Sequence, residues 1–435
     1  MKILYAASEA APFAKSGGLA DVAGSLPKAL VKDGVDCRVV IPLYGDLKFR
    51  DELTYVTNFS VPVGWRSQYC GLFTTVKDGV TYYFLDNEYY FKRSGLYGFY
   101  DDGERFAFFS RAVLEMMFYM DFTPDIINCN DWQTALTPVY LNLYYRHLDK
   151  FNKIKTVFTI HNIAYQGKYG LDILEDTCGI GNRDAHILEF DGCANFMKGA
   201  IEAADKITTV SPTYAKEILD PWFAYGLDDL LRQKQYKLCG ILNGIDTEVN
   251  DPATDKIIAA NYSAKNFKKG KAICKKSLQE RFGLDQDGSP VMAMVTRLVG
   301  HKGLDLVKCI AEGLLQEGIE LVILGTGEYQ YESFFSELAS WHPGRVGVFI
   351  GFNSQLAQQI YAGADIFLMP SKSEPCGLAQ MVACRYGTIP VVRETGGLKD
   401  SIRDSGDGMG NGFTFVNYNA HDLFQACWRA KEGYW

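Results

Sequence analysis

Two basic residues stand where they could neutralise an anion. The segment TRLVGHKGLDL puts Arg297 and Lys302 directly after an apolar run of strand length and before residues with helical spacing. A charge-assisted hydrogen bond contributes roughly 1.5 to 3 kcal/mol, so two cations directed at one leaving group could lower a reaction barrier. The pair therefore predicts a pyrophosphate contact, with solvated loop charges as the alternative.

An acidic residue follows a second apolar run. SKSEPCGLAQ places Glu374 after IFLMP and directly before Pro375, and Gly377 opens an expected helix. An acid before proline can present its side chain into a cleft while the following backbone amides face a phosphate, although a Glu that caps a surface loop is the alternative. Cys376 has no His nearby in the sequence to activate it, so we interpret it as a small packing residue and not as a nucleophile.

Two glycine-containing segments could approach phosphates. KSGGLADV places Lys15, Gly17 and Gly18 before a helix, where free backbone N–H groups favour an anion, although a plain strand-to-helix turn also needs glycine. The chain contains no GxxxxGK[ST] loop. ILGTGEYQ begins like a dinucleotide fingerprint, but Gln330 stands where the third glycine belongs, which disfavours a nicotinamide site. Its two glycines still permit close approach of the backbone to a nucleotide.

Patterns for metal binding are weak. DQDG contains the Asp285 and Asp287 pair that some transferases use to hold a metal, but it lies between an expected helix and an expected strand, which favours a polar turn. No HExxH or other convincing ligand spacing occurs. We expect neither a metal nor a cofactor.

The elements that must position these residues are strands that alternate with helices. Short apolar runs alternate with longer stretches of helical period, which predicts an α/β fold with mostly parallel sheets buried on both faces. The runs are ILYAA, CRVVIP, DIINCN, KTVFTIHN, KITTVS, CGILNG, VMAMVTR, LVILGTG, GVFIGF, IFLMPS and TIPVV. Such sheets bind ligands beyond the carboxyl ends of their strands. Those ends carry Lys15 to Gly18, His161, Asn162, Asn243, Arg297 and Glu374.

The number of strands exceeds what one ordinary sheet holds. The polar stretch Asp246 to Lys276 marks a boundary. We therefore predict two doubly wound Rossmann-like domains, residues 1–250 and residues 251–435, which face each other across a cleft. The candidate residues would converge on that cleft.

Composition excludes several classes of protein. The chain has 435 residues, of which 47% are hydrophobic, and its apolar runs are too short for a membrane-spanning helix. A formal net charge of −8 opposes binding to nucleic acid or to an anionic membrane surface. Its 11 scattered cysteines, with no CxxC, argue against a disulfide framework and a zinc ribbon, so we expect a cytoplasmic protein.

Eight segments occur in the order found in a known family. They are KSGGLADV, NCNDWQTAL, TIHNIAYQG, ILNGID, TRLVGHKGLDL, GTGE, SKSEPCGL and RETGGLKDSI. Together they resemble the bacterial glycogen synthase and plant starch synthase family. The resemblance implies a GT-B fold, with an N-terminal acceptor-side domain and a C-terminal nucleotide-sugar-binding domain. It also implies a retaining glycosyltransferase that adds glucose from ADP-glucose to the non-reducing end of an α-1,4-glucan such as glycogen, in the cytoplasm or, in a plant or alga, the plastid stroma.

The resemblance implies four catalytic residues. His161 would lie against the transferred glucose, and Glu374 would bind glucose hydroxyls and orient the ring. Arg297 and Lys302 would neutralise the diphosphate leaving group. Retention without an obvious metal, or a carboxylate pair at glycosidase spacing, favours a front-face route in which the departing phosphate assists deprotonation of the acceptor hydroxyl.

The remaining implied contacts surround the donor and the acceptor. Phe352 would lie against adenine, and the backbone amides of residues 376–378 would face the diphosphate. Asp131 and Trp132 would border the acceptor side. The donor-binding set is Lys15, Gly18, Asp21, Asn162, Asn243, Gly325, Gly327, Phe352, Cys376, Gly377 and Leu378.

The chain departs from the family pattern at several positions. Ser16 stands where the family usually has Thr, and Asn130 and Gln133 stand where the family reads HDWH. Val382 occupies the position of a further acid in related retaining transferases, which leaves Glu374 alone. Family members generally continue through a final helix beyond the position of Trp435, so we expect that helix to be missing.

Two other functions remain as alternatives. A catalytically weakened homologue or fragment would bind glucan or nucleotide sugar without efficient transfer. An NAD-dependent oxidoreductase rests on sheet topology alone. The sequence leaves open the choice between ADP-glucose and UDP-glucose, the oligomeric state, the preferred glucan length and any surface glucan site.

Overall fold

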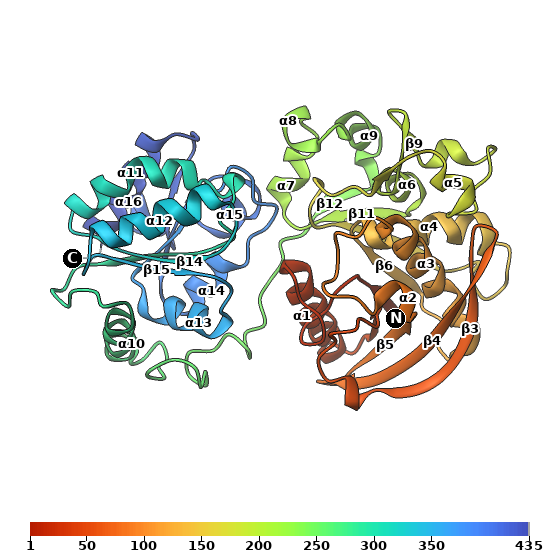
Figure 1. Cartoon of the computed structure of the whole chain (residues 1–435), viewed down its shortest axis with the longest axis horizontal. Helices are drawn as coiled ribbons and strands as arrows, with labels where there is room; N and C mark the ends of the chain where they lie inside the picture. The colour runs from red at the N-terminus through yellow and green to blue at the C-terminus, as the bar shows by residue number, and fades with distance from the viewer. Residues whose placement is uncertain (434–435) are drawn as a thin grey trace. The chain divides into compact units, whose positions relative to one another are not determined.

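The computed structural model describes residues 1–433, and Figure 1 shows their helices and strands. The chain divides into two compact units, Met1–Asn243 and Gly244–Trp435. The sequence predicts this division after residue 250, and the structure places it after Asn243. Residues 434 and 435, which end the predicted second domain, lie outside the described residues.

The first unit is built on a nine-stranded sheet with the order β12-β11-β7-β6-β1-β2-β5-β4-β3. The strands from β12 to β5 in this order are parallel, and β4 and β3 extend the sheet as an antiparallel hairpin. Their bounds are β1 (Lys2–Ala6), β2 (Asp36–Pro42), β3 (Thr54–Val63), β4 (Arg66–Lys77), β5 (Val80–Asp86), β6 (Ile126–Asn130), β7 (Lys155–Ile160), β11 (Lys206–Thr209) and β12 (Leu238–Gly240). The predicted α/β class with mostly parallel sheets is confirmed.

The helices of the first unit cover this sheet and its edge. They are α1 (Gly18–Lys32), α2 (Glu88–Phe91), α3 (Asp102–Glu115), α4 (Leu136–Tyr140), α5 (Ile173–Asp176), α6 (Phe196–Ala203), α7 (Pro212–Glu217), α8 (Pro221–Ala224) and α9 (Asp228–Gln233). A small antiparallel sheet has the order β8-β10-β9, with β8 (Lys168–Tyr169), β9 (Glu189–Phe190) and β10 (Cys193–Asn195). Helix α3 packs against β3 and buries Phe106, Phe108 and Phe109.

The second unit holds a six-stranded sheet with the order β15-β14-β13-β16-β17-β18, in which every neighbouring pair is parallel. The strands are β13 (Val291–Val295), β14 (Glu320–Gly325), β15 (Val346–Ile350), β16 (Ile366–Met369), β17 (Ile389–Arg393) and β18 (Phe413–Phe415). The helices are α10 (Phe267–Phe282), α11 (Leu304–Gln316), α12 (Tyr329–Trp341), α13 (Ser354–Gly363), α14 (Ala379–Arg385), α15 (Gly396–Ser401) and α16 (Ala420–Glu432).

Both faces of this second sheet are buried. Met292 and Met294 of β13 pack on the side of α11, α12 and α16, whereas Val291 and Ala293 pack on the side of α10 and α13 (Figure 1). Side chains of a strand alternate between the two faces, so a strand that is covered on both sides must be apolar throughout. This explains why β13 reads as an unbroken apolar run.

The strand order of each sheet reverses at one point. In the first unit the reversal lies between β1 and β6, and in the second it lies between β13 and β16. The loops that leave two such strands diverge to opposite faces, which opens a crevice beyond their carboxyl ends. The candidate segments that follow β1, β6, β13 and β16 therefore lie at these two reversal points.

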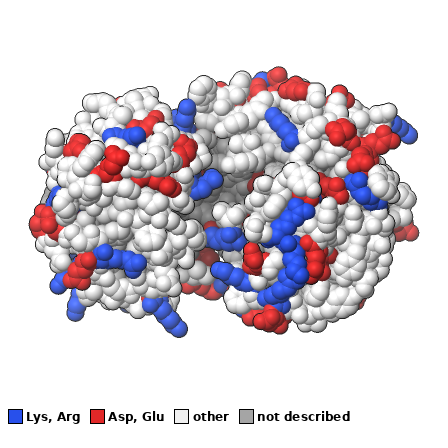
Figure 2. Space-filling view, viewed as in Figure 1, with Lys and Arg blue, Asp and Glu red and all other residues white. Residues whose placement is uncertain are grey.

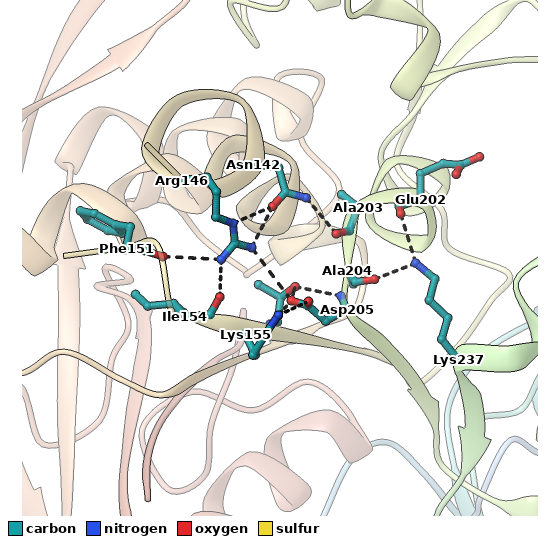
Figure 3. A network of polar contacts seen from close by, with 11 residues as sticks. Asn142, Arg146, Phe151, Ile154, Lys155, Glu202, Ala203, Ala204, Asp205 and Lys237 are labelled. Atoms are coloured by element: carbon teal, nitrogen blue, oxygen red, sulfur yellow. Dashed lines mark hydrogen bonds and ion pairs between the residues drawn. The ribbon is translucent and has the colours of Figure 1, made fainter. Parts of the chain in front are cut away.

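The opposite, amino-terminal edge of the first sheet carries a polar network (Figure 3). Asp205 accepts a hydrogen bond from the Thr156 backbone N–H at 2.9 Å, and it forms an ion pair with Lys155 at 3.2 Å. Lys237 donates to two backbone carbonyls, and Arg146 donates to carbonyls of the loop that follows it. These charges bind backbone groups and one another, so they fasten the start of β7 and β11.

The described residues show mixed surface charge (Figure 2) and contain no long apolar helix, as the composition of the chain predicts. Figure 2 shows basic and acidic side chains interspersed on the viewed face of each unit. No helix within residues 1–433 has the length and apolarity that a membrane crossing requires.

Candidate active site

The ends of β13 and β16 bring a lysine and a glutamate into contact. Lys302 Nζ lies 2.6 Å from Glu374 Oε2, and the Ser371 hydroxyl donates to the same oxygen at 3.0 Å. Glu374 is only 8% exposed, so its carboxylate is held by these partners and not by bulk water. Two motifs separated by 72 positions thus form one charged pair at the strand-order reversal.

Glycines allow the two loops to approach this closely. A Cβ atom at Gly303, which has φ +76°, would lie 2.1 Å from the Pro370 carbonyl oxygen. A Cβ at Gly396, with φ +45°, would lie 1.9 Å from the Glu374 carbonyl oxygen. Only glycine fits a backbone at this distance and with a positive φ. The loops that carry Lys302 and Glu374 are therefore positioned by glycines of neighbouring segments.

Arg297 lies beside this pair on the same loop. Its side chain is exposed, and among residues 1–433 its guanidinium makes no hydrogen bond or ion pair. Burial, followed by the charges of Lys302 and Arg297, lowers the pKa of His301 between them. Burial is the larger cause of this shift, and the part that comes from Lys302 and Arg297 reflects two cations close to the imidazole. The end of β13 is thus suited to an anion.

Gly325 and Gly327 allow the chain after β14 to lie close to the backbone of the segment after β13. A Cβ at Gly325 would lie 2.0 Å from the Thr296 carbonyl oxygen, and a Cβ at Gly327 would lie 2.3 Å from that of Leu298. The Gly327 N–H donates to the Glu332 carboxylate at 2.7 Å. In a dinucleotide fingerprint a backbone N–H at this place would donate to a phosphate. Here the Gly327 N–H donates to the Glu332 carboxylate instead.

The segment after β16 is held from inside. Cys376 is buried, in line with a packing role, and Gln380 donates to the Cys376 and Gly377 carbonyl oxygens at 3.1 and 2.9 Å. Gly377 has φ +70°, and Leu378 directly precedes α14. Phe352 follows β15 and is 84% exposed, so its ring is open to a planar ligand.

Asp131 braces the ends of β6 and β7 in the first unit. Its Oδ1 accepts hydrogen bonds from the backbone N–H groups of His161 at 2.7 Å and Asn162 at 3.3 Å. Burial raises the pKa of Asp131 to about 7, and these two hydrogen bonds oppose the rise. The residue has φ 57°, a region that non-glycine residues rarely adopt. The strained backbone places its carboxylate under the turn that carries His161.

His161 is held from its other side by Asn130. Its Nε2 lies 2.8 Å from Asn130 Oδ1, and burial lowers the pKa of His161 to about 4. The imidazole is therefore neutral near pH 7. Asn162 Oδ1 accepts from the Ala164 backbone N–H at 3.0 Å, which holds the following turn.

The segment before α1 contains a buried carboxylate that the sequence analysis did not assign. Glu9 is 2% exposed and accepts a hydrogen bond from the Ser16 backbone N–H at 2.5 Å. Burial raises the pKa of Glu9, while hydrogen bonds from Ser16 and Ala20 lower it. In the same segment, Lys15 and Asp21 form an exposed ion pair of 2.6 Å. The backbone N–H of Ser16, in the segment expected to bind an anion, thus already binds Glu9.

Trp132 lies in the core of the first unit, and Asn243 lies in the loop after β12. Trp132 is 8% exposed, and its ring contacts Phe106, Tyr169 and Phe196 at centroid distances of 5.2, 6.0 and 6.3 Å. Asn243 follows β12, and its backbone N–H donates to the Val210 carbonyl at 3.3 Å.

The structure brings together two groups of predicted residues, each within one unit. Lys302 and Glu374 are in contact in the second unit, and Asp131, His161 and Asn162 are joined in the first. Glu9, Asn130 and Gln380 contact predicted site segments, and their signals in the sequence are weak: an acid in an apolar run, a departure from a family motif, and a polar residue in a helix. No group of three or more His, Cys, Asp or Glu side chains suited to a metal ion occurs in residues 1–433.

Comparison with known families divides the chain in the same way as its structure. Residues 2–233 match the model of the starch synthase catalytic domain, and residues 276–432 match that of glycosyl transferases group 1. The chain is 52% identical to a glycogen synthase of Geobacillus thermodenitrificans over all of this chain and 91% of that protein. It is 51% identical to a glycogen synthase of Clostridium acetobutylicum, over all of this chain and 93% of that protein.

A solved structure shares the fold over almost the whole chain. The catalytic domain of starch synthase IV from Arabidopsis thaliana, bound to ADP and acarbose, matches with a TM-score of 0.92 and 34% identity. The match covers 99% of this chain and 92% of that chain. With both sequence relatives and a fold that agree, the chain belongs to the glycogen synthase and starch synthase family, a family of GT-B glycosyltransferases.

Proposed function

We propose that this protein is a retaining glucosyltransferase that transfers glucose from ADP-glucose to the non-reducing end of an α-1,4-glucan. The relatives of the chain are named glycogen synthases, and its solved relative was bound to ADP and acarbose. The observation that carries the proposal is the sheltered contact between Lys302 and Glu374 at the reversal of the second sheet. It provides a cation for a phosphate next to an acceptor for sugar hydroxyls.

The charges suggest how the leaving group would be stabilised. Lys302 has three N–H donors, so it can keep its bond to Glu374 and still donate to diphosphate oxygens. The exposed guanidinium of Arg297 supplies a second cation on the same loop. Donors that are already in place when charge develops on a leaving group cost no rearrangement at that moment. The proposal assigns this charge to side chains and needs no metal or cofactor.

The transfer itself is proposed to occur on one face of the sugar. The bond between the anomeric carbon and the phosphate oxygen breaks, the acceptor hydroxyl oxygen bonds to the same face, and its proton passes to the departing phosphate. Glu374 would accept hydrogen bonds from glucose hydroxyls and thereby fix the ring. Neutral His161 would lie against the same glucose, and Phe352 would stack on adenine.

Location is part of the proposal. All eleven cysteines are free thiols, and a set of unpaired thiols suits a reducing compartment. We therefore place the protein in the cytoplasm.

Nucleotide release tests the proposed function. The purified chain is given glycogen with either ADP-glucose or UDP-glucose, and a sample without glycogen serves as the control. We expect glycogen-dependent release of ADP, and NMR of the extended glucan should show new α-linked glucose. If a folded sample released no nucleotide from either donor and yet bound to glycogen, the protein would be a glucan-binding protein and not a synthase.

A further inference from the structure

The amide of Asn130 has a defined orientation at the end of β6. Its Nδ2 donates to the Ala6 carbonyl oxygen at 2.9 Å and to Asn128 Oδ1 at 3.0 Å. Its Oδ1 lies 2.8 Å from His161 Nε2. Asn128 is itself oriented, because its Nδ2 lies 3.3 Å from the Val157 carbonyl oxygen. Asn130 is fully buried, so water does not compete for these positions.

These contacts determine which nitrogen of His161 carries the proton. A backbone carbonyl can only accept, so the group of Asn130 that faces Ala6 must be the NH2 group. The carbonyl oxygen of the Asn130 amide then faces His161 Nε2, and an oxygen acceptor requires a protonated nitrogen there. A neutral imidazole has one N–H, so Nδ1 is left as the acceptor.

The ring is also fixed in position. Asp131 Oδ1 holds the His161 backbone N–H at 2.7 Å, and Asn130 holds the far nitrogen of the ring at 2.8 Å. Within residues 1–433, His161 Nδ1 makes no hydrogen bond. The acceptor on the ring is therefore the atom that remains for a ligand.

We propose that Asn130 is a positioning residue that fixes His161 as the Nε2–H tautomer and leaves Nδ1 to accept a hydrogen bond from a sugar hydroxyl. The second half of this statement rests on the proposed function, whereas the first half concerns the protein alone. The low pKa of His161 supports it, because a ring that stays neutral keeps a lone pair on Nδ1.

The tautomer is measured directly without any substrate. The full chain is labelled with 15N in its six histidines, and His161→Gln identifies the His161 signals. At pH 8 we expect a proton-coupled Nε2 and a bare Nδ1, in a single tautomer. A proton on Nδ1, or two tautomers in fast exchange, would overturn the assignment.

Three variants separate the role of Asn130 from general effects on folding. Asn130→Ala should yield a mixture of tautomers and lower kcat/KM about tenfold, the value of one lost hydrogen bond of ordinary strength. Asn130→Asp loses the N–H donor to the Ala6 carbonyl and should lower stability, but it keeps an oxygen toward Nε2 and should keep the Nε2–H tautomer at pH 8. Asn128→Ala removes one of the two acceptors that face Asn130 Nδ2 and leaves the Ala6 carbonyl as the other, so it should keep the Nε2–H tautomer.

The outcomes for the proposal and for the function are distinguishable. An Asn130→Ala protein with an unchanged single tautomer would overturn the role of Asn130. If the tautomers behave as expected but no donor supports transfer, the positioning role is supported and the proposed function fails. If Asn130→Ala does not fold, the comparison between Asn130→Asp and the unsubstituted protein still decides, since a mixture in the Asp variant would overturn the proposal.

Discussion

At the scale of single residues, the contact between Lys302 and Glu374 combines stability with function. Both are sheltered, because only 16% of the Lys302 side chain and 10% of the Glu374 side chain are exposed. Removing one partner of a sheltered ion pair leaves the other charge uncompensated, which is more costly than the pair is favourable. A variant at this position will therefore change stability as well as turnover, and a control is needed to separate them.

Lys302→Ala should lower kcat by about 100-fold or more, because the leaving group loses a preorganised donor. Lys275→Ala is the matched control, since Lys275 contacts Asp365 at 2.7 Å with exposed fractions of 13% and 14% in the same unit. Asp365 precedes β16 and so lies at the opposite edge of the sheet. Steady-state kinetics and chemical denaturation of both variants provide the test.

Both lysine variants should lose stability, and only Lys302→Ala should lose turnover per folded molecule. An equal fall of kcat in the two would mean that Lys302 acts only through stability, and the proposed contact with the diphosphate would be wrong.

At the scale of elements, the loops after β13 and β16 are held by backbone contact across the strand-order reversal. Gly303 directly precedes α11 and lies against Pro370, which directly follows β16, so one position couples both loops. The strands are held by their hydrogen bonds to neighbouring strands. A side chain added at Gly303 would therefore displace the two loops before it displaced the sheet. The geometry of the charged pair thus depends on elements as much as on side chains.

Gly303→Ala should reduce turnover strongly, because its Cβ would lie 2.1 Å from the Pro370 oxygen and would push Lys302 away from Glu374. Gly408→Ala is the control: its φ of +74° is close to the +76° of Gly303, and a Cβ there would meet nothing within 4 Å. Each substitution costs about 1 to 2 kcal/mol through the unfavourable φ. Kinetics and thermal unfolding should show the φ cost in both and the loss of turnover in Gly303→Ala alone.

If Gly408→Ala also lost turnover to the same degree, backbone strain in general would explain the effect. The coupling of the two loops through Gly303 would then be refuted.

At the scale of the whole molecule, the chain forms two compact units, and a buried carboxyl group in the second makes stability depend on pH. Glu320 at the start of β14 is fully buried, accepts from Gln279 at 2.8 Å through Oε2, and has no hydrogen-bond partner for Oε1 within the described residues. Burial raises the pKa of Glu320 from 4.5 to about 7, and Gln279 opposes the rise. The folded state therefore holds this proton more tightly than the unfolded chain does.

The contribution of Glu320 to stability is complete below pH 4.5 and is lost as the pH rises through about 7. A shift of this size corresponds to about 3 kcal/mol. Relative to Glu320→Gln, the natural chain should thus lose about 2 to 3 kcal/mol of unfolding free energy between pH 5 and pH 8. Denaturant unfolding of the full chain at both pH values, followed by a probe in the second unit, measures this difference.

Glu337→Gln, at an exposed position of α12, serves as the control for removing a carboxylate. If the natural chain and Glu320→Gln lost the same free energy between the two pH values, Glu320 would not be the titrating group.

Much of the fold could be predicted because its signals are local. A strand buried on both faces must be apolar throughout, so runs such as VMAMV and LVILG could be recognised one at a time. The hairpin β3–β4 has one partly exposed face and mixed side chains, and it was not recognised. Candidate residues such as Lys302 and Glu374 could be found because they directly follow apolar runs, and strand ends are visible in a sequence.

The sequence by itself determined the α/β class, most of the parallel strands and the positions at which charged residues follow those strands. Only the tertiary structure decided which of those residues meet. The contacts of Asn130 with His161 and of Lys302 with Glu374 depend on distances between segments 31 and 72 positions apart in the chain. Trp132 entered the core because Phe106, Tyr169 and Phe196 converge around it. Periodicity and strand ends are properties of neighbouring residues, whereas such contacts arise only when the sheet order and the packing of helices bring distant segments together.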